Sequence, residues 1–195
     1  MRDAVSARLR LKSVETLHEG WSRLRRATFD WLRRDGRWQE LIRETYDRGD
    51  GAAVLLRDRT RGTILLTRQF RYPTYVNDYH GMMIEVCAGK LDGADPVTGI
   101  RHEIEEETGY AVTALTEVLQ IFPSPGSVTE RLHLFVGDYD ASTRVSAGGG
   151  DEGEGEDIEL IETTLDEALA MVGRGEILDA KTIILLQHAR LNGLA

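Results

Sequence analysis

The sequence predicts a mixed α/β sandwich preceded by a small antiparallel sheet. Short apolar or alternating segments, typical of strands, recur through most of the chain. Two segments near the C-terminus have apolar residues at helical spacing. The strands and helices follow no regular strand–helix–strand repeat, so a mixed sheet is expected. A length of 195 residues indicates one domain, or one domain with a small appendage.

Composition excludes several classes of protein. The formal net charge of −9 excludes a generally basic nucleic-acid binder. The apolar runs are too short to cross a bilayer, and residues 1–4 lack the apolar core of a signal peptide. Cys87 is the single cysteine, which excludes an intrachain disulfide. We therefore expect a cytoplasmic protein with no membrane or nucleic-acid partner.

Charge is distributed unevenly along the chain. Residues 1–71 carry 17 basic and 10 acidic side chains, whereas residues 72–195 carry 7 basic and 23 acidic ones. One explanation is two solvated surfaces of opposite sign. The other is a site that combines arginines for phosphate groups with carboxylates for a metal. Composition alone leaves both explanations open.

The N-terminal part, residues 1–48, is expected to form the small antiparallel sheet. Polar and apolar residues alternate through residues 21–31. Asp35-Gly36 then predicts a two-residue hairpin turn before a strand over residues 37–42. Residues 49–195 form the main domain in this prediction.

The main domain is expected to contain six strands, a mobile loop and two C-terminal helices. We predict strands at residues 52–57, 63–70, 82–87, 111–121, 131–138 and 157–163, and helices at 165–173 and about 181–191. Residues 147–157 contain no apolar residue larger than alanine, and we predict a mobile loop there.

A further helix has well-marked ends. Asp95 is suited to the N-cap, Pro96 to the first helical position and Gly109 to the C-terminal cap. Between them, Ile100 and Ile104 continue an apolar stripe that begins at Val97.

Three glutamates border this stripe. At about 100° per residue, Glu103, Glu106 and Glu107 fall on one arc beside it. Like charges at these spacings cost about 0.2–0.5 kcal/mol per pair, and the negative end of the helix dipole adds to this cost. An exposed acidic helix is one explanation. Because the carboxylates lie next to the buried face, we favour a binding site for Mg²⁺ or Mn²⁺.

The segment over residues 89–110 resembles the Nudix box, Gly-x5-Glu-x7-Arg-Glu-U-x-Glu-Glu-x-Gly-U, in which U is a bulky aliphatic residue. The second half of the box fits from Glu103 to Tyr110. The first half departs from it, since Asp95 replaces the first glutamate, the spacing to Glu103 is one residue shorter, and His102 replaces the arginine.

The resemblance extends to the GDP-mannose pyrophosphatase branch of the Nudix family, which is close to the ADP-ribose pyrophosphatases. It is carried by residues 46–51, 68–71, 124–130, 148–150, 156–159, 175–177 and 181–182. It implies a Nudix α/β/α sandwich whose N-terminal sheet builds a homodimer and donates substrate-binding residues. It also implies Mg²⁺, with Mn²⁺ as a substitute.

The activity implied is hydrolysis of a nucleoside diphosphate-sugar, with GDP-mannose giving GMP and mannose 1-phosphate. Two alternatives stay open: hydrolysis of ADP-ribose to AMP and ribose 5-phosphate, and a sensor that binds a nucleotide-sugar without turnover.

By this resemblance, Glu103, Glu107 and the main-chain carbonyl of Ala88 bind the metal, and Glu106 supports them as a catalytic group. Glu156, at the end of the 147–157 loop, is the expected catalytic base and a further metal ligand. The positions that match substrate-contacting residues are Trp21, Arg43, Glu44, Arg71, Lys90, Glu130 and Lys181. For Trp21 an apolar dimer contact is the alternative, and for Lys181 a solvated position at a helix start.

Overall fold

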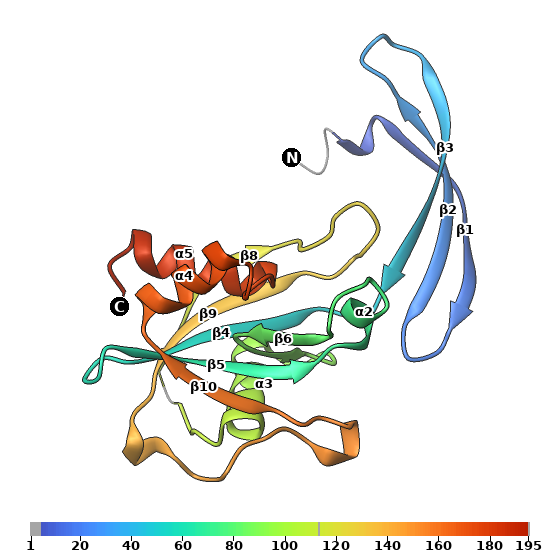
Figure 1. The fold of residues 1–195 in the computed structure, drawn as a ribbon. Helices are drawn as coiled ribbons and strands as arrows, with labels where there is room; N and C mark the ends of the chain where they lie inside the picture. The colour runs from blue at the N-terminus through green and yellow to red at the C-terminus, as the bar shows by residue number, and fades with distance from the viewer. Residues whose placement is uncertain (1–4, 113, 195) are drawn as a thin grey trace. The chain divides into compact units, whose positions relative to one another are not determined.

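The computed structural model describes residues 5–112 and 114–194, and the chain divides into two units (Figure 1). The first unit comprises Met1–Asp50 and Phe122–Arg131, and the second comprises Gly51–Ile121 and Leu132–Ala195. In the described part of the chain, every helix is too short or too polar to cross a membrane.

The first unit is a three-stranded antiparallel sheet, as predicted. Its order is β1 (Leu9–Glu19), β2 (Arg23–Leu32), β3 (Trp38–Asp47). The predicted two-residue turn is wrong, because residues 33–37 separate β2 from β3. The Arg33 amide donates to the Arg37 carbonyl at 2.9 Å, and Gly36, with φ of +82°, reverses the chain between them. Residues 122–131 join this unit through Tyr46, which exchanges main-chain hydrogen bonds with Ser127 and Thr129.

The second unit contains a seven-stranded mixed sheet with a main order of β10-β5-β4-β9-β8. Its strands are β4 (Gly51–Asp58), β5 (Thr63–Phe70), β6 (Met82–Glu85), β7 (Cys87–Lys90), β8 (Leu115–Ile121), β9 (Leu132–Asp138) and β10 (Glu159–Thr163). Strand β4 pairs in parallel with β9, and the other pairs are antiparallel.

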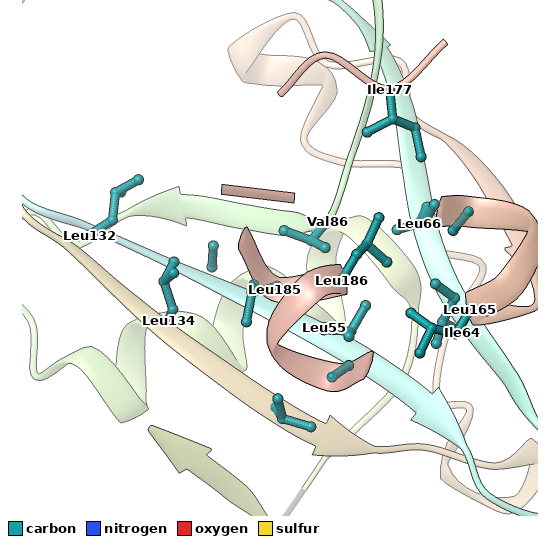
Figure 2. Packing of buried hydrophobic residues seen from close by; sticks show 14 residues of the cluster. Leu55, Ile64, Leu66, Val86, Leu132, Leu134, Leu165, Ile177, Leu185 and Leu186 are labelled. Atoms are coloured by element: carbon teal, nitrogen blue, oxygen red, sulfur yellow. The ribbon is translucent and has the colours of Figure 1, made fainter. Parts of the chain in front are cut away.

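Helices cover both faces of this sheet, so the predicted α/β/α sandwich is confirmed. On one face, α4 (Leu165–Arg174) and α5 (Ala180–Leu191) contribute Leu165, Leu185 and Leu186 to a buried cluster (Figure 2). On the other face, α3 (Pro96–Glu103) contributes Ile100 to a second cluster. Strand β4 is apolar over residues 52–56 because its alternate side chains enter the two clusters.

The predicted strand over residues 82–87 is interrupted at Val86. The Val86 amide donates to the Thr182 hydroxyl at 2.8 Å and so leaves the strand ladder. As a result β6 pairs with β5, whereas β7 pairs with β4. The strand predicted over residues 111–121 begins only at Leu115.

The predicted capping residues of the acidic helix are confirmed. Asp95 accepts a hydrogen bond from the Thr98 amide at 3.1 Å, and Gly109 ends the helix with φ of +75°. The final turn, η1 (Ile104–Thr108), is a π-helix, which the sequence did not indicate. The remaining short helices are α2 (Tyr72–Tyr75), η2 (Ala141–Thr143) and η3 (Glu152–Glu154).

Candidate active site

Glu103 lies directly against the backbone of Gly89. Glu103 ends α3, and Gly89 lies in β7, on the strand that pairs with β4. A Cβ atom at position 89 would collide with the Glu103 carboxylate, so the close approach requires glycine there. The glycine that opens the segment over residues 89–110 therefore leaves space for a half-buried carboxylate.

Glu107 is a buried carboxylate. Its side chain is 1% exposed, and its Oε2 accepts a hydrogen bond from the Ala88 amide at 3.2 Å. The Cys87 thiol donates a second hydrogen bond. Burial raises the pKa of Glu107 to about 8, and the negative charges of Glu103 and Glu156 act in the same direction. The two hydrogen bonds act in the opposite direction and lower the pKa. The Arg71 guanidinium interacts electrostatically with Glu107, but its ion pair is with Glu85.

Glu103 and Glu106 show the same electrostatic pattern. Burial raises the pKa of Glu103 to about 7, with contributions from Glu106 and Glu156. Burial and the charge of Glu156 also raise the pKa of Glu106, although Glu106 is largely exposed. The carboxylates predicted to act together therefore influence one another's charge, which is typical of functional sites.

The loop predicted as mobile is anchored to the end of the acidic helix. The amides of Gly149 and Gly150 donate to the main-chain carbonyls of Glu107 and Glu106, at 2.9 and 3.1 Å. Further along, the Glu156 carboxylate accepts a hydrogen bond from the Asp151 amide at 3.1 Å. Glu156 is half-buried and contributes to the pKa shifts of Glu103, Glu106 and Glu107, so the structure places it with these carboxylates.

The residues present fit a hard divalent cation. Among residues 5–112 and 114–194, no three Asp, Glu, His or Cys side chains form a ready-made set of metal ligands. Mg²⁺ needs no such set, because it is typically held by one or two carboxylates, with water and substrate phosphates as its other ligands. Glu103 and Glu107 supply carboxylates of this kind, and the raised pKa values indicate that a positive charge would stabilise both.

Two of the predicted substrate-binding cations share one carboxylate, that of Glu85. Its Oε2 lies 2.7 Å from Arg71 Nε, and its Oε1 lies 2.5 Å from Lys181 Nζ. Lys181 also pairs with Asp179 at 3.0 Å. Burial would raise the pKa of Glu85, but attraction to Lys181 and Arg71 lowers it below its ordinary value. Lys181 is thus a partly buried ion-pair partner, not a solvated helix-start residue.

The other predicted substrate residues lie elsewhere. Lys90, on β7, forms an ion pair with Asp92. Four of them belong to the first unit: Trp21, Arg43, Glu44 and Glu130.

In the first unit, Trp21 is 71% exposed and lies between β1 and β2. The Arg48 guanidinium lies 5.8 Å from its ring centroid, and Arg48 Nε lies 3.3 Å from a Glu130 carboxylate oxygen. Glu44 accepts hydrogen bonds from Arg26, and Arg43 donates one to the main chain of Ile42.

Sequence analysis missed Glu85 and the contact of Cys87 with Glu107. Both residues lie in the segment Ile84-Glu85-Val86-Cys87, which has the composition of a core strand. A charged residue within that apolar segment was the available signal for Glu85, because a buried carboxylate requires a partner. The partners themselves are 14 and 96 positions away in the sequence.

Comparisons with known proteins match both units. Residues 8–46 match the family model described as the GDP-mannose pyrophosphatase NudK N-terminal domain, and residues 47–185 match that of the NUDIX domain. The chain is 48% identical over 190 residues to a GDP-mannose pyrophosphatase of Pectobacterium atrosepticum, covering 97% of both chains. It is 47% identical to that of Cronobacter sakazakii over 191 residues, 97% of this chain and 99% of the relative. With the protein of that name from Yersinia enterocolitica, identity is 46% over 181 residues, 92% and 94% of the two chains.

Proposed function

The chain belongs to the Nudix family, and on this premise we propose that it is a pyrophosphatase that hydrolyses GDP-mannose to GMP and mannose 1-phosphate. The observation that carries the proposal is the buried Glu107 carboxylate, with Glu103 and Glu156 contributing to its electrostatic environment. The names of relatives that match nearly the whole chain support the choice of substrate.

Nudix proteins use a divalent metal, and here we propose Mg²⁺, with Mn²⁺ as a substitute. Glu103, Glu107 and the main-chain carbonyl of Ala88 would hold it. When bound, such an ion supplies positive charge that stabilises the negative charge developing on the diphosphate oxygens.

The protein's own residues supply binding and proton transfer. Arg71 binds non-bridging diphosphate oxygens, since its terminal nitrogens have no hydrogen-bond partner among residues 5–112 and 114–194. Glu156 accepts at a carboxylate oxygen the proton that the attacking water loses. That water's oxygen bonds to one phosphorus atom, and the bond from this phosphorus to the bridging oxygen breaks. Glu106, next to Glu107 on η1, supports the metal-binding carboxylates.

For the first unit we propose a role in a homodimer and in substrate binding. A sheet of about 50 residues is too small to bury a core by itself. In keeping with this, the side chains of Leu11, Val14 and Ile42 are 60%, 55% and 55% exposed. Trp21, Arg43, Glu44 and Glu130 are its proposed substrate residues. The cytoplasmic location stays a prediction.

The test is a hydrolysis panel with Mg²⁺, in which a phosphomonoesterase releases phosphate from the products. The panel contains GDP-mannose, ADP-ribose and other nucleotide-sugars, and Glu107→Gln is the control for metal-dependent turnover. We expect the highest kcat/KM with GDP-mannose. A higher kcat/KM with ADP-ribose would show that ADP-ribose, not GDP-mannose, is the substrate. Tight binding without turnover would identify a sensor.

A further inference from the structure

Glu85 lies at the end of β6 and contacts two cations that come from distant parts of the second unit. Arg71 follows β5, and its main chain is fixed by a 2.8 Å hydrogen bond from its amide to the Gly81 carbonyl. Lys181 lies in the first turn of α5, whose N-cap residue Asp179 also pairs with Lys181. Each oxygen of the Glu85 carboxylate contacts a different cation, so a single side chain fixes the spacing of Arg71 and Lys181.

These contacts leave unused hydrogen-bond donors on both Arg71 and Lys181. Arg71 uses Nε for Glu85, and within the described residues its two terminal nitrogens make no hydrogen bond. Lys181 carries three N–H donors, and Glu85 and Asp179 account for two of them. The Arg71 side chain is 37% exposed, and it interacts electrostatically with Glu107 and Glu156. Both cations therefore keep hydrogen-bond donors that Glu85 and Asp179 do not use, and Arg71 interacts electrostatically with the proposed metal-site glutamate Glu107.

Stability alone does not account for such a cluster. The Glu85 and Lys181 side chains are 6% and 12% exposed, and burying ions is often no more favourable than burying apolar residues of the same volume. Arg71, Lys181, Glu85 and Asp179 carry two positive and two negative charges, so the cluster is neutral until an anion approaches. Two adjacent cations whose charges are already balanced suit a ligand with two linked phosphoryl groups.

We propose that Glu85 is a positioning residue, which holds Arg71 and Lys181 at the spacing that binds the two phosphoryl groups of the substrate. This inference rests on the proposed function for the identity of the substrate. The role assigned to Glu85 requires only that the ligand contain a diphosphate.

Glu85→Asp tests this directly, because it keeps the charge balance while retracting the carboxylate by one methylene group. The matched control is Glu159→Asp, since Glu159 pairs with Arg68 at 3.0 Å across exposed positions of β10 and β5. The probe is inorganic diphosphate, and its Kd is measured by calorimetry with Mg²⁺ well below the Tm of each variant. We expect Kd to rise roughly 10- to 100-fold for Glu85→Asp, the range of one charge-assisted hydrogen bond, and to stay unchanged for Glu159→Asp.

A double variant separates positioning from a general structural effect. If Glu85 acts through Arg71, adding Glu85→Asp to Arg71→Met should raise Kd by clearly less than Glu85→Asp raises it alone. Equal effects in both backgrounds would overturn the proposal. So would a Glu85→Asp protein with a lower Tm and unchanged Kd, or a wild-type protein that does not bind diphosphate. Weakened diphosphate binding in a protein that fails to hydrolyse GDP-mannose would support the role of Glu85 and refute the proposed substrate.

Discussion

The Gly149 amide donates a 2.9 Å hydrogen bond to the main-chain carbonyl of Glu107, which joins the glycine loop to the acidic helix end. At Gly148, where φ is +70°, a Cβ atom would lie 2.6 Å from the Thr108 carbonyl carbon, so side chains are excluded from this contact. The loop that carries Glu156 is therefore anchored to Glu107, whose carboxylate is the most buried of the cluster. This contact explains how a glycine-rich loop can hold the proposed base near the glutamates proposed to bind the metal.

Replacing either Glu103 or Glu107 with Gln should abolish Mg²⁺-dependent turnover without lowering the melting temperature of the metal-free protein. Each substitution removes a carboxylate whose ionised form is disfavoured by burial and by neighbouring glutamates. Steady-state assays at saturating Mg²⁺ and thermal unfolding in a chelator measure the two effects. Near-normal rates in both variants would contradict the metal assignment.

Stability of the metal-free protein should fall as pH rises through about 7 to 8. The pKa values of Glu103 and Glu107 are raised to about 7 and about 8, so the folded state favours their protonated forms. Their contribution is fully present below the ordinary glutamate pKa and is lost as pH rises through the folded values. Urea unfolding between pH 5.5 and 8.5 in a chelator measures the trend.

Glu107→Gln provides the control for this pH dependence and should flatten it. Mg²⁺ should restore stability at the upper end of the range and release protons on binding. An unfolding midpoint that is constant or rising with pH in the metal-free wild type would show that the two carboxylates titrate in their ordinary range.

Gly89→Ala should weaken metal-dependent turnover by roughly 10- to 100-fold, the usual effect of disturbing groups that orient metal ligands. The new Cβ atom would collide with the Glu103 carboxylate and displace it. Gly173→Ala is the control, since a Cβ there meets no atom within 4 Å. Mg²⁺ titrations of activity should show a higher half-saturating concentration for Gly89→Ala only. Equal Mg²⁺ dependence in both variants would show that Gly89 does not affect metal binding.

Ile42→Asp should convert a homodimer into monomers. Ile42 is an exposed apolar residue of β3, and a charge on a buried dimer face costs far more than one in water. Leu191→Asp, at an 84% exposed position of α5, should leave the oligomeric state unchanged. Light scattering at micromolar concentration measures both. A wild-type monomer would refute the dimer proposal.

Local chemistry explains which parts of the fold could be predicted. The helix caps at Asp95 and Gly109 depend on residues within one turn, and β5 over Thr63–Phe70 follows from a local apolar pattern. The π-helical turn could not be predicted, because the periodicity over so short a segment does not distinguish it from an α-helical turn. The division of β6 from β7 depends on Thr182, which is 96 positions from Val86.

The same reasoning applies to the candidate site. The glutamates of the box were found because they lie within five residues of one another and resemble a known motif. Glu85 was not found, since its role depends on Arg71 and Lys181, which only the folded sheet and helix bring together. Predicting it requires the pairing of β5 with β6 and the docking of α5.

Glu156→Gln should lower kcat by roughly 10²- to 10⁴-fold, the usual loss on removing a general base, with a smaller change in KM. Glu156 is held by the Asp151 amide and contributes to the pKa shifts of Glu103, Glu106 and Glu107. Glu152→Gln and Glu154→Gln are the matched controls from the same loop, and both should be nearly silent. Glu154 is the more demanding control, because its charge also contributes to the pKa shifts of Glu103 and Glu106. Steady-state kinetics of the three variants with GDP-mannose distinguish these roles. A crippled Glu154→Gln protein beside an active Glu156→Gln protein would move the base two residues toward the N-terminus, onto η3.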